Sequence, residues 1–146
     1  MSKFPLLLGL LAFASVSLNS IGRAAQVVST SGECIGLQHG NTVDGTPLVL
    51  FHCNGRPTQQ WTLSAGQISG AGGSCMDVQG SAAADGATVI LVACNGRPSQ
   101  RWNVSNGQIV GIGGKCLDSM GGGTADGTTL IIVSCSTSPT QQWSLQ

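Results

Sequence analysis

Three copies of a Gln-x-Trp tripeptide, spaced 41 residues apart, constrain this chain more than any other feature. They are Gln59-Gln60-Trp61, Gln100-Arg101-Trp102 and Gln141-Gln142-Trp143, and they contain all three tryptophans of the protein. The six cysteines keep the same interval: each repeat has two of them 19 residues apart, and the second precedes the tryptophan by 8. No insertion or deletion separates these markers, so the sequence predicts three copies of one structural unit, over 26–66, 67–107 and 108–146.

The first 25 residues are predicted to lie outside the fold, as a secretory signal peptide. Lys3 precedes an apolar run from Phe4 to Leu18, and small residues around Arg23 follow it, with cleavage expected after Ala24. The alternative is an uncleaved membrane anchor, which the short apolar run disfavours. We therefore expect a secreted, extracellular protein with no stable membrane span once the signal is removed.

The predicted mature chain, 26–146, carries little charge. Four basic residues remain against six acidic ones, which gives a net charge of −2. A nucleic-acid binder needs a concentrated positive surface, and so few basic residues cannot make one. The length suits one domain with one core.

The six cysteines indicate an oxidising compartment and a disulfide framework. Although six cysteines allow 15 pairings, a symmetric fold would repeat its own bridge. The equal spacing therefore favours Cys34–Cys53, Cys75–Cys94 and Cys116–Cys135. A zinc site is the weaker alternative, because the sequence has no Cys-x-x-Cys and no paired histidines. No metal or cofactor is expected.

Each repeat consists of short strand-like runs separated by turn signals. In the first repeat the runs are 27–28, 34–37, 48–51 and 61–63, and Asp44-Gly45 is a hairpin turn signal. No segment has a helical period, and 22 glycines argue against long helices. Four strands in each of three units predict an all-β fold of about twelve strands with threefold pseudo-symmetry. A propeller or a solenoid has a similar period, but three blades are fewer than the usual minimum of about four, so a closed barrel fits better.

With these features together, the chain resembles the ricin B-type lectin β-trefoil. The resemblance rests on the three Gln-x-Trp units, on the two cysteines of each unit, and on Cys75-Met76-Asp77 and Cys116-Leu117-Asp118 as Cys-x-Asp motifs. The same pattern marks family 13 carbohydrate-binding modules. The resemblance covers residues 26–146 and implies a β-trefoil, a six-stranded barrel closed by three hairpins, with up to one shallow sugar site per repeat.

The resemblance also implies what a sugar site contains. The carboxylate comes from Cys-x-Asp, an aromatic ring lies two residues before the second cysteine, and an Asn precedes the Gln of Gln-x-Trp. Such groups suit sugars because hydroxyls bind charged acceptors and the C–H face packs on a ring. The candidate sugar-binding residues are Asp77, Asn95 and Gln100 in the second repeat, Asp118 and Gln141 in the third, and Phe51, Asn54 and Gln59 in the first.

No repeat matches the pattern completely. Val92 and Val133 stand where the second and third repeats need a ring, and Gly36 removes the carboxylate of the first. The preceding Asn is replaced in every repeat, by Thr58, Ser99 and Thr140. Because a missing ring forfeits about 1 kcal/mol of directed contact, each site is expected to be weak, and three weak sites together gain from avidity.

Structural roles compete with these assignments. The glutamines are candidates for backbone hydrogen bonding, the tryptophans for core packing, and Asp77 and Asp118 for capping turns. His39 and His52 have no partner set for a metal or for acid–base chemistry. An enzyme is not expected, because the acids are spread by the symmetry and do not pair across one cleft.

The sequence thus predicts a secreted, non-catalytic carbohydrate-binding protein that recognises galactose- or xylan-type glycans. The competing hypothesis is a degenerate trefoil that acts as a protein-interaction or inhibitor scaffold without binding sugar. The missing rings and Asn residues favour that alternative.

Overall fold

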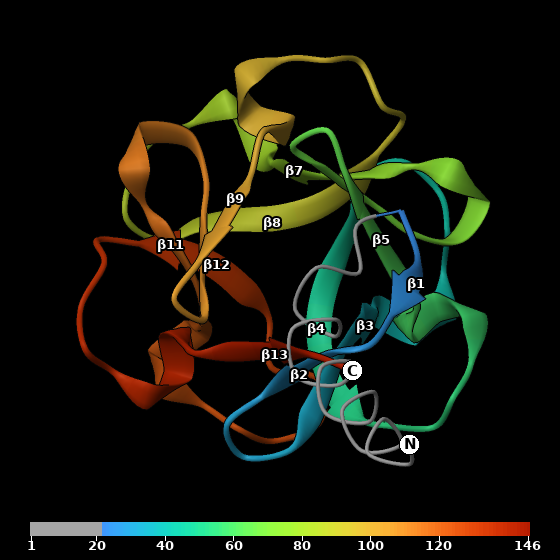
Figure 1. Cartoon of the computed structure of the whole chain (residues 1–146), viewed down its shortest axis with the longest axis horizontal. Helices are drawn as coiled ribbons and strands as arrows, with labels where there is room; N and C mark the ends of the chain where they lie inside the picture. The colour runs from blue at the N-terminus through green and yellow to red at the C-terminus, as the bar shows by residue number, and fades with distance from the viewer. Residues whose placement is uncertain (1–21) are drawn as a thin grey trace, which may run out of the picture.

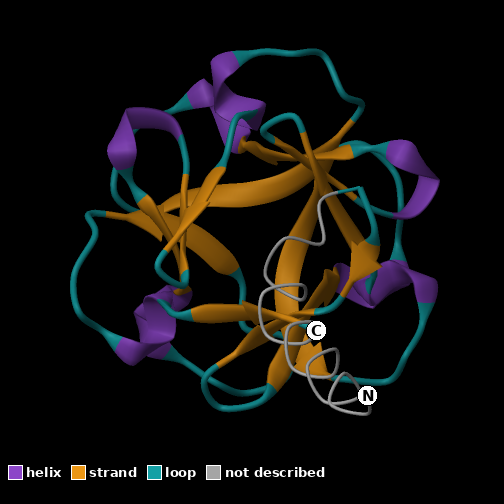
Figure 2. Cartoon of the chain, in the orientation of Figure 1, coloured by secondary structure: helices purple, strands orange, loops and turns teal. Residues whose placement is uncertain are grey.

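The computed structural model describes residues 22–146, and the predicted signal segment up to residue 21 lies outside the described residues. Residues 22–146 fold into 13 strands and eight single-turn 3-10 helices. Figure 1 looks down an approximate threefold axis, and Figure 2 shows the strands around the centre with the 3-10 helices at the periphery. Within residues 22–146, no helix has the length and hydropathy needed to cross a bilayer.

The strands recur in each repeat with bounds close to those predicted. The first repeat contributes β2 (Val27–Ser29), β3 (Glu33–Leu37), β4 (Thr46–His52) and β5 (Trp61–Ser64). The second contributes β6 (Gln67–Ser69), β7 (Cys75–Val78), β8 (Ala87–Val92) and β9 (Asn103–Ser105), and the third β10 (Gln108–Val110), β11 (Cys116–Ser119), β12 (Leu130–Val133) and β13 (Trp143–Leu145). The 3-10 helices are η1 (Gln38–Gly40), η2 (Pro57–Gln59), η3 (Ala71–Gly73), η4 (Gln79–Ser81), η5 (Pro98–Gln100), η6 (Ile112–Gly114), η7 (Met120–Gly122) and η8 (Pro139–Gln141). The all-β prediction is confirmed.

One short strand, β1 (Ala24–Ala25), precedes the predicted start of the fold. Its residues pair with Thr62 and Trp61 of β5, and the Gly22 N–H donates to the Leu63 carbonyl at 2.7 Å. The prediction that the first 25 residues lie outside the fold is therefore wrong for residues 22–25. The sequence did not predict this strand, because two small residues that pair through their backbone show no alternation of apolar and polar side chains. Cleavage after Ala24 stays a prediction.

Three hairpins form a ring around the pseudo-axis (Figure 1). They are β3–β4, β7–β8 and β11–β12. Each joins the next through equivalent residues: Pro47 pairs with Ile90, Thr88 pairs with Ile131, and Thr129 bridges to Val49. The end of each repeat pairs with the start of the next in β5–β6, β9–β10 and β13–β2, and the last of these pairs closes the chain on itself.

The core is one hydrophobic cluster to which each repeat contributes matching residues. Trp61, Trp102 and Trp143 are all buried in it. Each indole N–H donates to a backbone carbonyl in the first strand of its own hairpin. The acceptors are the carbonyl oxygens of Ile35, Met76 and Leu117, at 2.9–3.1 Å from the indole nitrogens. The predicted core role of the tryptophans is confirmed, with a hydrogen bond that satisfies the polar end of each ring.

The predicted disulfides Cys34–Cys53, Cys75–Cys94 and Cys116–Cys135 all form, with Cα–Cα distances of 5.1, 5.0 and 5.0 Å. Each bridge ties the first strand of a hairpin to a cysteine one or two residues after the end of the second strand. No cysteine remains free among the described residues. The zinc alternative for the cysteines is therefore set aside.

The aspartate of each Asp-Gly pair joins one repeat to another. Asp44 Oδ1 accepts from Ala93 N at 3.0 Å, and Asp85 Oδ1 accepts from Ser134 N at 2.9 Å. The ring closes where Asp126 Oδ1 accepts from His52 N at 2.8 Å. In the first repeat the pair ends the loop over residues 38–45 that connects the two strands of the β3–β4 hairpin.

The following glycine completes each junction. Gly45, Gly86 and Gly127 have φ between +91° and +96°, a region that other residues rarely adopt. Each glycine N–H donates across the junction, at 2.7–2.8 Å, to the carbonyl of Leu91, Ile132 or Leu50. The Asp-Gly pair is therefore a contact between repeats as well as a turn.

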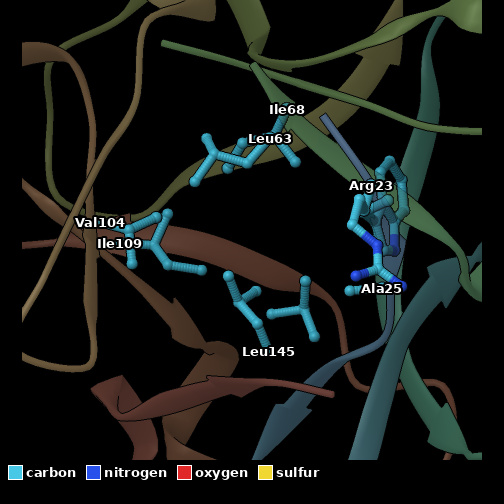
Figure 3. A pocket seen from close by; sticks show the side chains of 9 residues that line it. Arg23, Ala25, Leu63, Ile68, Val104, Ile109 and Leu145 are labelled. Atoms are coloured by element: carbon cyan, nitrogen blue, oxygen red, sulfur yellow. The ribbon is translucent and has the colours of Figure 1, made fainter. Parts of the chain in front are cut away.

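A small apolar cavity of about 10 Å³ lies where the three repeats meet. Figure 3 shows the side chains that surround it, which include the equivalent residues Leu63, Val104 and Leu145. A space of this size holds one water molecule at most. It is a gap in the packing and not a ligand site.

Two glycines are required by the tryptophan packing. A Cβ atom on Gly111 would lie 2.5 Å from Cζ3 of Trp102, and Gly70 has the same relation to Trp61. We expect Gly111→Ala to lower the free energy of unfolding by about 1–3 kcal/mol, because the buried ring must shift. Gly36→Ala is the matched control, since its Cβ meets nothing nearer than 3.4 Å, and chemical denaturation measures both. Equal losses in the two variants would contradict this packing account.

The junction between the second and third repeats predicts an acid dependence of stability. The hydrogen bond from the Lys115 ammonium, 2.8 Å from Asp85, is the main cause that holds the pKa of Asp85 below its ordinary value of 3.8. A carboxyl group whose pKa is lower in the folded state than in the unfolded state stabilises the fold. This contribution is fully present above the pKa of the unfolded state and is lost as the pH falls through the pKa of the folded state. We therefore expect Lys115→Gln to flatten the decline of stability below pH 5 relative to the wild type.

Unfolding measured from pH 2 to pH 7 at low salt checks this expectation. Arg97→Gln is the control, because it removes the same charge from a side chain that forms no ion pair with the described residues. An unchanged acid limb in Lys115→Gln would rule out the Lys115–Asp85 pair as its cause.

Candidate functional site

The glutamine of each Gln-x-Trp tripeptide is buried and connects two backbone groups. In the second repeat Gln100 Oε1 accepts from Asn95 N at 2.8 Å, and Gln100 Nε2 donates to the Ala93 carbonyl at 3.1 Å. Gln59 and Gln141 make the same pair of bonds in their own repeats. All three side chains are at most 2 % exposed. In this structure they position the neighbouring groups, and Gln59 also lines a cavity of the first repeat.

The second repeat brings together the three candidates Asp77, Asn95 and Gln100. Asp77 lies on β7 and is 7 % exposed, and its Oδ2 accepts from Gln100 Nε2 at 3.0 Å. Its other oxygen, Oδ1, is buried and has no hydrogen-bond partner. A buried carboxylate oxygen without a donor is costly to the fold. The burial of this oxygen therefore does not stabilise the fold.

The third repeat repeats this arrangement with one difference. Asp118 Oδ2 accepts from Gln141 Nε2 at 3.1 Å, as its counterpart does. Asp118 Oδ1, however, accepts from the Ser119 N–H at 2.7 Å. Both oxygens of Asp118 are therefore used within the protein, whereas Asp77 keeps one free. Ring positions Val92 and Val133 are half-buried aliphatic side chains.

The candidates of the first repeat, Phe51, Asn54 and Gln59, line one cavity of about 340 Å³. The cavity lies between η1 and η2, next to the position where Gly36 replaces the carboxylate. Phe51 is 36 % exposed and its ring centroid lies 4.4 Å from that of His52. The volume is within the range of small-molecule sites. Asp126, from the third repeat, also lines it.

The polar residue after each second cysteine has a local role. Asn54 Oδ1 accepts from Arg56 N at 2.9 Å, and Asn95 Oδ1 accepts from Arg97 N at the same distance. Ser136 holds the third loop in the same way. These bonds shape the loop around the buried glutamine. Sugar contacts by Asn54 and Asn95 stay predictions.

Two features of these sites could not be predicted from the sequence. Ser81 Oγ donates to Ser99 Oγ at 3.2 Å, which joins η4 to η5 beside Asp77. Arg56, His39 and Asp126 line the cavity of the first repeat, although none of them was a candidate. Only contacts between loops distant in sequence bring these residues to the sites. The described residues contain no group of three or more His, Cys, Asp or Glu placed to hold a metal ion.

Comparisons with known proteins agree with this geometry. The profile of the ricin-type beta-trefoil lectin domain matches residues 23–146. The designed threefold-symmetric protein ThreeFoil has a TM-score of 0.77 and 29 % identity, over 84 % of this chain and 96 % of its own. The exo-β-1,3-galactanase 1,3Gal43A from Clostridium thermocellum has a TM-score of 0.77 and 25 % identity, and 84 % of this chain covers 30 % of that enzyme. The C-half of an earthworm R-type lectin in complex with GalNAc has a TM-score of 0.74 and 15 % identity, over 85 % of this chain and 98 % of its own.

No curated protein matches the chain in sequence. The three hairpins, the closed ring of repeats and the buried Gln-x-Trp groups define a β-trefoil. Together with the profile match, they show that the chain belongs to the ricin-type β-trefoil lectin domain family. Domains of this family generally bind carbohydrate without catalysis, so the function class of the chain is lectin-like carbohydrate binding.

The different bonding of the two buried aspartates predicts a difference in stability. Asp118→Asn leaves one acceptor for two donors, Gln141 Nε2 and Ser119 N, so one buried N–H loses its partner. Asp77→Asn leaves one acceptor for the single donor Gln100 Nε2. Because an unsatisfied buried donor costs about 1–3 kcal/mol, we expect Asp118→Asn to be the more destabilising by about that amount. Urea denaturation of the two variants measures it, and the opposite order would refute the bonding described above.

Proposed function

We propose that the protein is a secreted lectin that binds galactose- or xylan-type glycans through Asp77 of the second repeat and Asp118 of the third. Asp77 accepts a hydrogen bond from a sugar hydroxyl through its unpartnered Oδ1, and Asp118 accepts one in addition to the bonds from Gln141 and Ser119. Gln100 and Gln141 hold the carboxylates in place through their buried amides. The aliphatic side chains of Val92 and Val133 offer the C–H face of a sugar less contact area than an aromatic ring would, so each site is weak. A repeating or branched glycan that occupies several sites at once gains affinity by avidity.

The single observation that carries the proposal is the free oxygen of Asp77. Asp77 Oδ1 is buried without a hydrogen-bond donor, while the other oxygen is held in place by Gln100. A sugar hydroxyl supplies the missing donor in a charge-assisted hydrogen bond. The loops that flank this oxygen, η4 and η5, are joined only through Ser81 and Ser99 among the side-chain bonds. We propose that they part when a sugar enters.

Two further observations support the ligand class and the location. The galactanase that is 25 % identical to this chain acts on a β-1,3-galactan, which favours galactose-type over xylan-type ligands. The three disulfides and the absence of free cysteines among the described residues support an extracellular protein, since such bonds persist in oxidising compartments.

A scaffold that binds protein and not sugar is the second candidate. One observation favours it: Asp77 Oδ1 is closed to solvent, and the Ser81–Ser99 bond holds the adjacent loops together. In that case Asp77 is a remnant without a ligand. The two candidates differ in whether the aspartates matter for binding.

A glycan array decides between them. The full chain, secreted by an expression host and purified, is tested on galactosides and xylo-oligosaccharides beside an Asp77→Asn/Asp118→Asn variant. We expect the double variant to bind about tenfold or more weakly, because each site loses a charged acceptor. Glu33→Gln is the control, since that carboxylate bonds only with Ser29 and Ser31 among the described residues and lies outside both sites.

Three outcomes are informative. Loss of binding in the double variant alone supports the lectin proposal and identifies the glycan. Equal binding by the wild type and the double variant rejects these two aspartates as the site. No binding by the wild type at millimolar sensitivity rejects the lectin proposal in favour of the scaffold.

A further inference from the structure

The cavity of the first repeat differs in kind from the aspartate sites. It is bounded by η1 and by η2 of the first repeat and by the Asp-Gly junction of the third repeat. In the second repeat the Ser81–Ser99 bond joins the equivalent loops. The counterparts of those two serines, Gly40 and Thr58, stand on opposite sides of the open cavity. The space thus exists because Gly36 has no side chain and because no hydrogen bond equivalent to Ser81–Ser99 joins the two loops.

The hydrogen-bonding polarity of this cavity is reversed. In the other repeats the glutamine Nε2 donates to both a backbone carbonyl and an aspartate, but Gln59 Nε2 donates only to the His52 carbonyl, at 2.9 Å. One of its N–H groups therefore has no acceptor among the described residues. Asn54 uses its Oδ1 for Arg56 N, and its own NH₂ group makes no bond among them. The Gln59 amide is thus a donor without the aspartate acceptor that Gln100 and Gln141 have, and the NH₂ group of Asn54, like that of Asn95 in the second repeat, is a further donor without a partner among the described residues.

The cavity lining includes one basic and one acidic side chain, and they differ in their partners. Arg56 lines it and forms no ion pair with any described residue. Among the described residues that line the cavity, the one carboxylate is Asp126, and its two oxygens accept from His52 N and contact His52 Nδ1, each at 2.8 Å. His39 is the imidazole of the described lining. A ligand therefore meets a guanidinium without an ion-pair partner and a carboxylate that is already hydrogen-bonded to His52.

From these contacts we infer that the first repeat binds a sugar residue that carries a carboxylate, such as a glycuronic acid. The carboxylate accepts from Arg56, Asn54 and Gln59, and the C–H face of the ring packs on Phe51. A neutral sugar fits less well, because its hydroxyls are donors as well as acceptors and the one carboxylate among the described lining residues is already hydrogen-bonded to His52. This inference deepens the proposed lectin function and rests on it for the class of ligand.

Titration calorimetry with matched ligand pairs tests the inference. The full chain is titrated at low salt with the methyl β-glycosides of D-glucuronic and D-galacturonic acid and with their neutral parents, methyl β-D-glucoside and methyl β-D-galactoside. We expect at least one acid to bind about tenfold or more tightly than its parent, as a charge-assisted contact allows. Equal affinity within both pairs, or no binding of either acid, overturns the inference.

Matched variants locate the site. Arg56→Gln should abolish the preference for the acid, whereas Arg97→Gln, the equivalent change 41 residues later, should not. Gly36→Asp places a carboxylate against Gln59, where an ideal Cβ has room at 3.4 Å, and should weaken acid binding more than Gly36→Asn does. Equal effects of Arg56→Gln and Arg97→Gln, or of Gly36→Asp and Gly36→Asn, overturn the assignment to this cavity.

The double variant Asp77→Asn/Asp118→Asn separates this inference from the proposed function. Acid binding that survives in it while neutral-glycan binding is lost supports both. Acid binding that disappears with the two aspartates overturns the inference and leaves the proposed function intact. Acid binding without any neutral-glycan binding in the wild type supports the first-repeat site and rejects the proposed use of Asp77 and Asp118.

Discussion

The structure depends above all on the buried side-chain amide of each Gln-x-Trp tripeptide. Gln59, Gln100 and Gln141 each satisfy one N–H and one C=O in the irregular segment after the second strand of a hairpin. The glutamine side chains themselves are buried, and a buried amide left without its partners would cost about 1–3 kcal/mol. The tryptophan two residues later then reaches back to the first strand of the same hairpin and seals the core.

This scaffold leaves the carboxylate position free to vary. The first repeat folds with Gly36 where the others have Asp77 and Asp118, and its glutamine keeps both backbone bonds. The aspartates are therefore not required for the trefoil itself, and their burial costs stability. Their retention in two repeats agrees with a binding role. The same freedom lets the first repeat exchange an acceptor for donors without disturbing the barrel.

No repeat is complete by itself. Each Asp-Gly junction supplies a carboxylate and an N–H to another repeat, and the third junction places Asp126 at the cavity of the first repeat. The pairing of β13 with β2 closes the ring. A binding site at one repeat is therefore built partly by a segment distant in sequence, and its geometry depends on closure of the whole chain.

The sequence by itself determined the repeat, the three disulfides, the all-β class and the buried tryptophans, because these follow from local spacing that symmetry multiplies by three. It did not reveal β1, whose pairing is made by the backbone of two small residues. Nor did it show that Asp77 keeps a free oxygen while Asp118 does not, or that Arg56 and Asp126 share a cavity with Phe51. Only the tertiary structure decided these points, because each depends on which atoms of different loops lie within hydrogen-bonding distance, and the spacing of residues along the chain does not specify that.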